Sequence, residues 1–194
     1  MSRIRPERIA LLVGVFVAAY LALFAAALWS GALIAAERGM AGGALALMSG
    51  FGDPQLRRHV EVGRMGTYVS YDFSISAPGG SQRVKGKHPF HAHNLVLFAA
   101  LVLATPALSA RRRALALAAG LAVIFAIDTG IVMGDLLSIE DAKFEVAGEK
   151  NVWAPLKSAV AVLRYSQPTG GAFMAPVFVW ALLVGLGAAR RPAA

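Results

Sequence analysis

Four long apolar stretches constrain this chain more than any other feature. They run from Ile9 to Ala36, from Asn94 to Ala110, from Ala114 to Gly134 and from Ala172 to Ala189. A helix that crosses a bilayer needs about 20 mostly apolar residues. Across all four stretches the only charged residue is Asp128. We therefore predict a membrane protein with an all-α core, built as a four-transmembrane-helix bundle.

The composition agrees with a membrane protein. Hydrophobic residues make up 57% of the chain and charged residues 15%, against about 45–50% and about 25% in a typical soluble domain. The absence of cysteine excludes disulfides, thiolate metal sites and a cysteine nucleophile. The first apolar stretch follows basic residues, as in a signal peptide, but it is much longer than the roughly 7–15 apolar residues of such peptides. We interpret it as a retained anchor.

Arginines at the ends of the stretches predict the orientation. Eight of them, offset by Glu7, account for +7 of the net charge of +8, and they are Arg3, Arg5, Arg8, Arg111, Arg112, Arg113, Arg190 and Arg191. With four spans they fall on one side, and short basic loops stay cytoplasmic. The many alanines and the preference for arginine over lysine are typical of a bacterial protein. We expect a bacterial inner (plasma) membrane protein with both termini cytoplasmic and no nucleic-acid partner.

This orientation divides the chain into five segments. Residues 1–36 hold the cytoplasmic N-terminus and the first span, 37–93 a periplasmic segment with a small sheet, and 94–134 a transmembrane hairpin. Residues 135–171 form a second periplasmic segment with an interfacial helix, and 172–194 the last span and a cytoplasmic tail. The two outer segments together predict a small periplasmic α+β cap.

The strand signal in the first outer segment is an alternation of side chains. Between Tyr68 and Ser76, one face of an extended chain carries Val69, Tyr71, Phe73 and Ile75, and the other carries Ser and Asp. Such alternation indicates a half-buried strand. Residues 59–62 and 82–84 are candidate antiparallel partners. A sheet of three short strands is marginal alone, so its apolar face must rest on the outer helix ends, the second outer segment or a partner protein.

Two amphipathic helices are expected beside the sheet, at Gly43–Phe51 and at Lys157–Tyr165. The second of these, with Trp153 nearby, suits the headgroup region of a membrane. We predict that partner proteins bind through residues of the cap, namely Val69, Tyr71, Phe73, Ile75 and Trp153.

Three histidines lie together before the second stretch, namely His88, His91 and His93. Histidine is the commonest side-chain metal ligand, so the trio is a candidate site for zinc or copper. Its spacing is not that of a standard site, and the alternative is that these residues and Asn94 cap a helix at the membrane surface. We expect no cofactor unless the trio binds metal.

Asp128 and Asn94 are the candidate intramembrane polar residues. An acid inside an apolar span is costly and usually faces a partner in the protein interior. Since the second stretch begins at Asn94, Asp128 is expected to pair with Asn94, His91 or His93. A structural hydrogen bond and a proton relay are both open interpretations.

The sequence predicts no catalytic residues. It contains no Gly-x-Ser-x-Gly elbow, no phosphate-binding glycine loop and no His-Glu-x-x-His motif. We therefore expect a protein that is not an enzyme.

The stretch from His93 to Phe98, continuing through Leu103–Pro106 to Arg111–Arg113, resembles small membrane proteins associated with exosortase systems. The resemblance covers about a quarter of the chain. It implies an accessory role in envelope protein sorting or polysaccharide export. It does not imply the transpeptidase, which uses a cysteine.

These observations predict a non-enzymatic accessory or assembly subunit of a bacterial cell-envelope complex, whose partners are the lipid bilayer and other membrane or periplasmic proteins. One alternative is a metal-handling protein or membrane enzyme built on the histidine trio and Asp128. Another is a subunit of an electron-transfer or light-harvesting complex.

Overall fold

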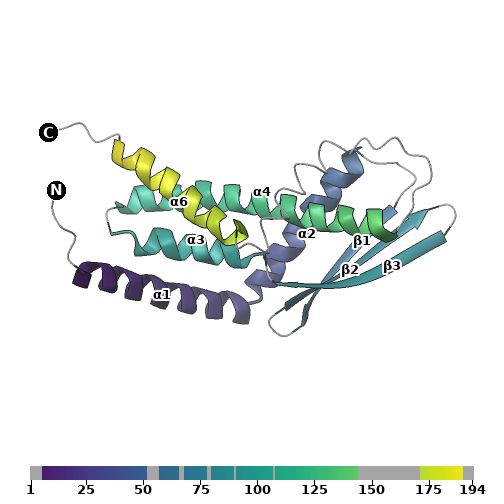
Figure 1. The fold of residues 1–194 in the computed structure, drawn as a ribbon, viewed down its shortest axis with the longest axis horizontal. Helices are drawn as coiled ribbons and strands as arrows, with labels where there is room; N and C mark the ends of the chain where they lie inside the picture. The colour runs from purple at the N-terminus through teal and green to yellow at the C-terminus, as the bar shows by residue number, and fades with distance from the viewer. Residues whose placement is uncertain are drawn as a thin grey trace.

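Helices and a small sheet make up the described part of the chain. The computed structural model describes residues 6–51, 57–65, 68–77, 80–89, 91–106, 108–143 and 171–189. The helices are α1 (Pro6–Trp29), α2 (Ala32–Phe51), α3 (His93–Ala104), α4 (Ala110–Lys143) and α6 (Gly171–Ala189). The strands are β1 (Arg57–Met65), β2 (Tyr68–Ala77) and β3 (Gly80–Pro89). Figure 1 shows α1, α3 and α6 at one end and the sheet at the other, with α2 between them, and α4 extends from the helical end to the sheet.

The first apolar stretch folds as two helices instead of one span from Ile9 to Ala36. The break falls at Gly31, whose φ is +76°. Glycine adopts this left-handed conformation without the steric cost that other residues meet. The chain therefore turns after Trp29, and α2 continues to Phe51 in a new direction.

The predicted bundle of four transmembrane helices is wrong. Within the described residues, only Ile9–Trp29 of α1 and Ala110–Leu137 of α4 are long and apolar enough to cross a membrane. The 12 residues of α3 rise only about 18 Å, short of the roughly 30 Å of a bilayer core. The helix stops because Thr105 is extended (φ −81°, ψ 106°), as expected of a residue that precedes proline.

The last apolar helix, α6, packs on its neighbours. Its described apolar stretch, Met174–Val184, is shorter than a span. The indole Nε1 of Trp180 donates to Thr105 Oγ1 at 2.8 Å, and Arg113 Nη2 donates to the Thr105 carbonyl oxygen at 3.0 Å. The end of α3 is thus joined to both α4 and α6, around a small core of Phe98, Val102 and Ile124.

The predicted three-stranded sheet is confirmed. Its strands are antiparallel in the order β1-β2-β3, and the register pairs Val62 with Tyr71 and Asp72 with Lys85. The predicted helix at Gly43–Phe51 is confirmed as the second half of α2. The predicted helix at Lys157–Tyr165 and the residue Trp153 lie outside the described residues.

The main core joins the sheet to the helices. The apolar face of β2 packs in one cluster with Met40 and Met48 of α2 and with Val132 and Leu136 of α4. This apolar face is called the inner face below, and the opposite, polar face is called the outer face. The short sheet is therefore stabilised by the chain's own helices.

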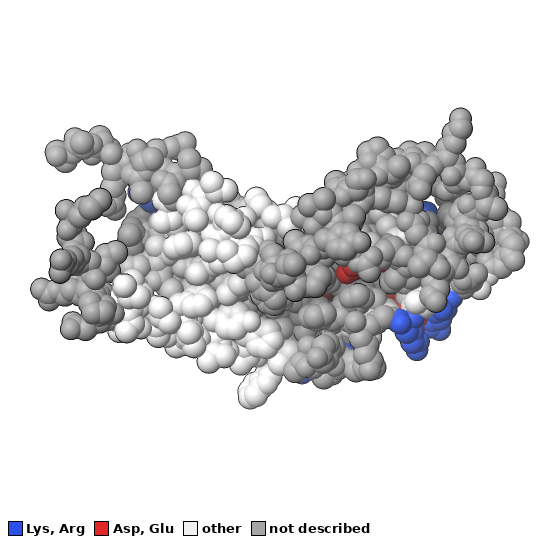
Figure 2. All heavy atoms as spheres, in the orientation of Figure 1, with Lys and Arg blue, Asp and Glu red and all other residues white. Residues whose placement is uncertain are grey.

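The helical end of the molecule exposes an apolar surface. No part of the Ile9–Trp29 stretch is buried, and Leu11 and Leu21 are among its exposed side chains. Phe178 and Leu182 of α6 and Leu115 of α4 are also exposed. On the face shown in Figure 2, the described atoms over the helices form a broad uncharged area, and Lys and Arg gather mainly at the sheet end. Such a surface fits contact with lipid better than contact with water.

Gly120 of α4 provides a test of this packing. A Cβ at this position would lie 1.9 Å from Phe98 Cζ and 2.3 Å from its Cε1, so the Gly120→Ala variant must displace a fully buried ring. We expect it to lose about 1–3 kcal/mol of stability, measured by thermal unfolding in detergent. The control is Gly130→Ala on the same helix, where nothing lies within 4 Å, and it should gain up to about 1 kcal/mol. Equal unfolding temperatures for the two variants would contradict the packing.

Candidate functional site: a buried acidic junction and a charged sheet face

Glu37 connects three elements at the place where the sheet meets the helices. It lies on α2, its side chain is fully buried, and its two carboxylate oxygens accept hydrogen bonds from different directions. The Tyr71 hydroxyl on β2 donates to Oε2, and the backbone N–H of Ala92 donates to Oε1 at 2.8 Å. Ala92 is the N-cap of α3 and has no side-chain cap of its own, so Glu37 joins α2 to the start of α3 through the backbone of this residue. The carboxylate also suits the positive end of the α3 dipole.

Burial changes the acid–base behaviour of this pair. Loss of water raises the pKa of Glu37 above its usual value, and the hydrogen bonds from Tyr71 and Ala92 oppose this change. The pKa of Tyr71 is also raised, first by burial and then by the charge of Glu37. The tyrosine hydroxyl therefore stays protonated and remains a donor to the carboxylate.

A second contact in the same region joins His91 to α4. The imidazole Nε2 of His91 lies 3.8 Å from Oδ2 of Asp135, and both residues are buried, at 7% exposure each. The contact is an ion pair when the imidazole is protonated. It ties the residues that precede α3 to the sheet end of α4.

Asn94 and Asp128 form one of the expected contacts. Nδ2 of Asn94 donates to Oδ1 of Asp128 at 2.9 Å, between α3 and α4, and the two side chains are 1% and 0% exposed. The remaining oxygens, Asn94 Oδ1 and Asp128 Oδ2, have no hydrogen-bond partner among the described residues. We call Glu37, Tyr71, His91, Asn94, Asp128 and Asp135 the junction cluster. It holds three buried carboxyl groups and one imidazole.

The predicted metal site is not assembled by the described side chains. His88 lies on β3 opposite Val69, His91 contacts Asp135, and His93 is the first residue of α3. Among the described residues, no group of three or more His, Asp or Glu could hold a metal ion. The side chain of His88 is outside that set, so the zinc or copper site of the trio stays a prediction.

Four of the residues predicted to bind a partner are buried in the core of the fold. Val69, Tyr71, Phe73 and Ile75 are all 4% exposed or less, because α2 and α4 cover the inner face. The outer face is the one left exposed.

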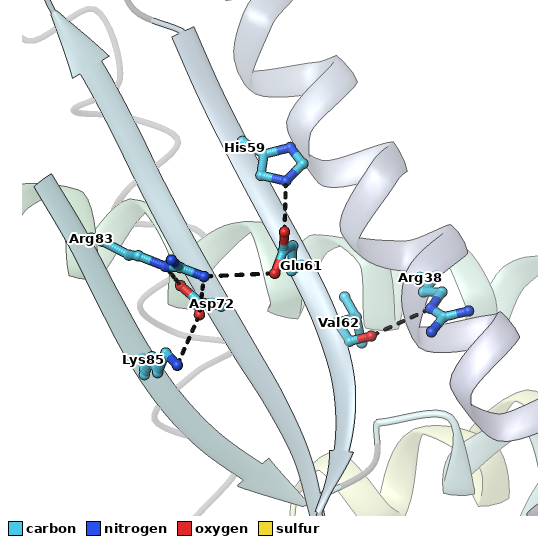
Figure 3. Close-up of polar contacts among 7 residues, drawn as sticks. All are labelled: Arg38, His59, Glu61, Val62, Asp72, Arg83 and Lys85. Carbon is cyan, nitrogen blue, oxygen red and sulfur yellow. Dashed lines mark hydrogen bonds and ion pairs between the residues drawn. The ribbon is translucent and has the colours of Figure 1, made fainter. Parts of the chain in front are cut away.

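The outer face carries a row of alternating charges across the three strands (Figure 3). Arg83 on β3 binds both carboxylate oxygens of Asp72 on β2, and Lys85 Nζ lies 3.4 Å from Asp72 Oδ2. Arg83 also contacts Glu61 Oε2 at 3.6 Å, and His59 Nε2 lies 3.7 Å from Glu61 Oε1. We call these five residues the charged sheet face. With Ser74, all of them except Lys85 line a depression of about 170 Å³.

These ion pairs are exposed, and this limits what they contribute to stability. The hydrogen bond from Arg83, with help from Lys85, lowers the pKa of Asp72, so the carboxylate remains charged near neutral pH. Exposed pairs typically stabilise a fold by less than about 1 kcal/mol. Fixed, opposite charges on an open surface contribute more to orienting a charged partner.

Sequence reasoning missed Glu37 because it lies directly after the predicted end of the first span. A usable signal was Tyr71, which the alternation places on the apolar face of its strand. A buried tyrosine hydroxyl needs a hydrogen-bond partner, and an acid that follows an apolar stretch is a natural candidate.

Comparison with known proteins adds nothing to this geometry, since no family model, no curated protein and no solved structure matches the chain.

The contact between Glu37 and Tyr71 can be tested by a double-mutant cycle. The Tyr71→Phe variant leaves a buried carboxylate oxygen without its donor, so we expect a loss of about 1–3 kcal/mol. The loss should shrink when Glu37→Gln is also present, because the two residues are coupled. Tyr20→Phe on α1 is the matched control and should leave the unfolding temperature unchanged. Additive losses in the cycle would show that the contact does not stabilise the fold.

Stability should also depend on pH through Glu37. The folded pKa lies above the usual 4.5, so the folded state holds this proton more tightly than the unfolded state does. The stabilising contribution is full below pH 4.5 and is lost as the pH rises through the raised pKa. Thermal unfolding between about pH 4 and pH 8 should therefore show a smaller decline in Glu37→Gln than in the wild type. Parallel curves would argue against a buried, titrating Glu37.

Proposed function

We propose that this chain is a membrane-anchored, non-enzymatic accessory or assembly subunit of a bacterial cell-envelope complex, and that the charged sheet face binds its partner protein. One observation carries the proposal. The chain covers the inner face of the sheet with its own helices, and the outer face presents fixed opposite charges on three adjacent strands. Complementary charges of this kind increase association rates and select the partner.

The two long apolar helices support the membrane anchor. The 21-residue stretch of α1 rises about 32 Å, which matches the roughly 30 Å of a bilayer core. The stretch of α4 has 28 residues and rises about 42 Å, so it crosses with a tilt or extends beyond the core. The short apolar helices α3 and α6 pack beside them.

The arrangement of the helix ends supports an inner membrane location with the sheet in the periplasm. In Figure 1, the start of α1, the start of α4 and the end of α6 lie at the end opposite the sheet. Arg111 and Arg112, at the start of α4, are exposed there. Because short basic segments stay cytoplasmic, we infer that the end of α4 that carries Arg111 and Arg112 faces the cytoplasm.

The resemblance of the α3 region to exosortase-associated membrane proteins supports a role in the envelope. Such a role needs a membrane anchor and a surface for contact, and it needs no catalytic group. The charged sheet face supplies the surface. Its acids and bases hold one another in fixed positions, so the pattern of charge that a partner would meet is fixed as well.

The proposal is tested by isolating the full chain from the membranes of its own cells in a mild detergent. We expect one partner protein in a fixed ratio to the chain. The Arg83→Ala, Lys85→Ala double variant should reduce the recovered partner about tenfold, which corresponds to about 1.4 kcal/mol of binding free energy. The matched control is Arg111→Ala, Arg112→Ala at the opposite end, which removes the same charge and should retain the partner.

Two results would overturn the proposal. One is a wild-type chain that purifies alone from its own membranes. The other is an equal loss of partner in the sheet variant and in the control, because the charged sheet face would then have no specific role.

A further inference from the structure

A row of three polar residues crosses the outer face of the sheet beside the charged sheet face, where β2 ends and β3 begins. The register pairs Arg57 of β1 with Ser76 of β2, and Ser76 with Ser81 of β3. Directly opposite residues share a face of the sheet, and their Cβ atoms lie about 4.5–5.5 Å apart. All three side chains are exposed. We call this set the arginine–serine row.

Arg57 differs from the other basic side chains of the sheet in having no partner. Arg83 and Lys85 bind an acid of β2, Arg64 donates to a backbone carbonyl of α1, and Arg58 has an interaction of its own. Across the part of the sheet that the structure describes, Arg57 alone carries a positive charge that neither a hydrogen bond nor an ion pair engages.

The acids of the outer face do not compensate this charge. Glu61 and Asp72 are bound by bases of the charged sheet face, and Glu61 lies about 13 Å from Arg57 along the strand. Within the charged sheet face two acids balance two bases when His59 is neutral. Arg57 therefore leaves the described outer face with an excess of positive charge at the end that carries the arginine–serine row.

The donors of this row suit a carboxylate. An arginine guanidinium presents a planar fork of N–H donors that matches the two oxygens of a carboxylate, and the hydroxyls of Ser76 and Ser81 are further donors. A carboxylate accepts hydrogen bonds at both oxygens and donates none. The row therefore offers both the charge and the hydrogen bonds that such a group requires.

The row also continues into the depression of the charged sheet face. Ser74 and Arg83 line that depression, and Ser74 is the next outer-face residue of β2, about 6.6 Å from Ser76. Serine side chains are short, so the surface above β2 is open from the row to the depression. An extended segment that lies along β2 contacts both.

We propose that the arginine–serine row binds an Asp or Glu side chain on an extended segment of the partner protein. The inference rests on the proposed function, because it names the chemistry by which that partner docks. The charges of the charged sheet face balance one another, whereas Arg57 requires an acid from outside. The row therefore selects a partner with a carboxylate at one end of the docked segment, and this fixes its direction along β2.

The test uses the full chain purified with its partner in mild detergent. Arg57→Gln removes the charge and the forked donors, so we expect about tenfold less recovered partner, and Arg57→Glu, which repels a carboxylate, should lose more. The Ser76→Ala, Ser81→Ala double variant should lose about threefold. The matched control, Arg112→Gln, removes an exposed arginine at the opposite end of the molecule and should keep the partner. Unfolding temperatures equal to that of the wild type separate a binding defect from misfolding.

A zero-length cross-link identifies the carboxylate. A carbodiimide joins a lysine amine to a carboxylate in contact with it, with loss of water, and Arg57→Lys supplies the amine while it keeps the charge. Mass spectrometry of the digested product should show a partner peptide joined to position 57 through Asp or Glu. Arg112→Lys is the matched control and should show no such peptide.

Two results would overturn the arginine–serine row as a carboxylate site. One is a folded Arg57→Glu variant that retains the partner in full. The other is a cross-link at position 57 to an acid that is not part of a peptide, because the row would then bind an acidic polymer or lipid.

Failure of this inference and failure of the proposed function have different signatures. If Arg83→Ala with Lys85→Ala releases the partner and Arg57→Glu does not, the row is wrong and the charged sheet face keeps its role. If the wild-type chain purifies alone, the proposed function is wrong and the row falls with it.

Discussion

The buried carboxylate of Glu37 is the interaction on which the arrangement of sheet and helices depends. Hydrogen bonds from Tyr71 and Ala92 fix β2 and the start of α3 relative to α2. Hydrophobic packing of Met40, Met48 and the inner face is extensive, but it has no direction of its own. The two oxygens of the Glu37 carboxylate accept hydrogen bonds from different elements, so they fix the position of the sheet relative to the helices. A shifted sheet would leave a buried acid without donors.

The same junction explains why charge is tolerated near the apolar helices. Asp128 and Asp135 lie on the part of α4 that packs with the sheet, where Val132 and Leu136 belong to the main core. The acids therefore gather where α4 meets the sheet, and Asn94 and His91 contact them there. Acids in membrane helices usually face such an interior.

Sequence patterns predicted the parts of this fold that depend on local periodicity. The alternation around Tyr71 gave the central strand and its buried face, and the acid in an apolar stretch gave the contact between Asp128 and Asn94. A count of apolar residues gave the wrong number of membrane-spanning helices, because it does not detect the turn at Gly31 or the end of α3 before Pro106. Glu37 was missed for a different reason, since its partners are 34 and 55 residues away and distant pairings leave no local pattern.

The register of β1 separates the buried inner face of the sheet from the charged sheet face. Side chains of a strand alternate between its faces, so Val62 and Arg64 share the inner face with Tyr71, and Glu61 shares the outer face with Asp72. Arg64 therefore turns toward the end of α1, and Glu61 turns toward Arg83. A shift of one residue would exchange these roles and bury Glu61 against α2. Because the buried inner face forbids that shift, the charged sheet face stays on the exposed side of the sheet.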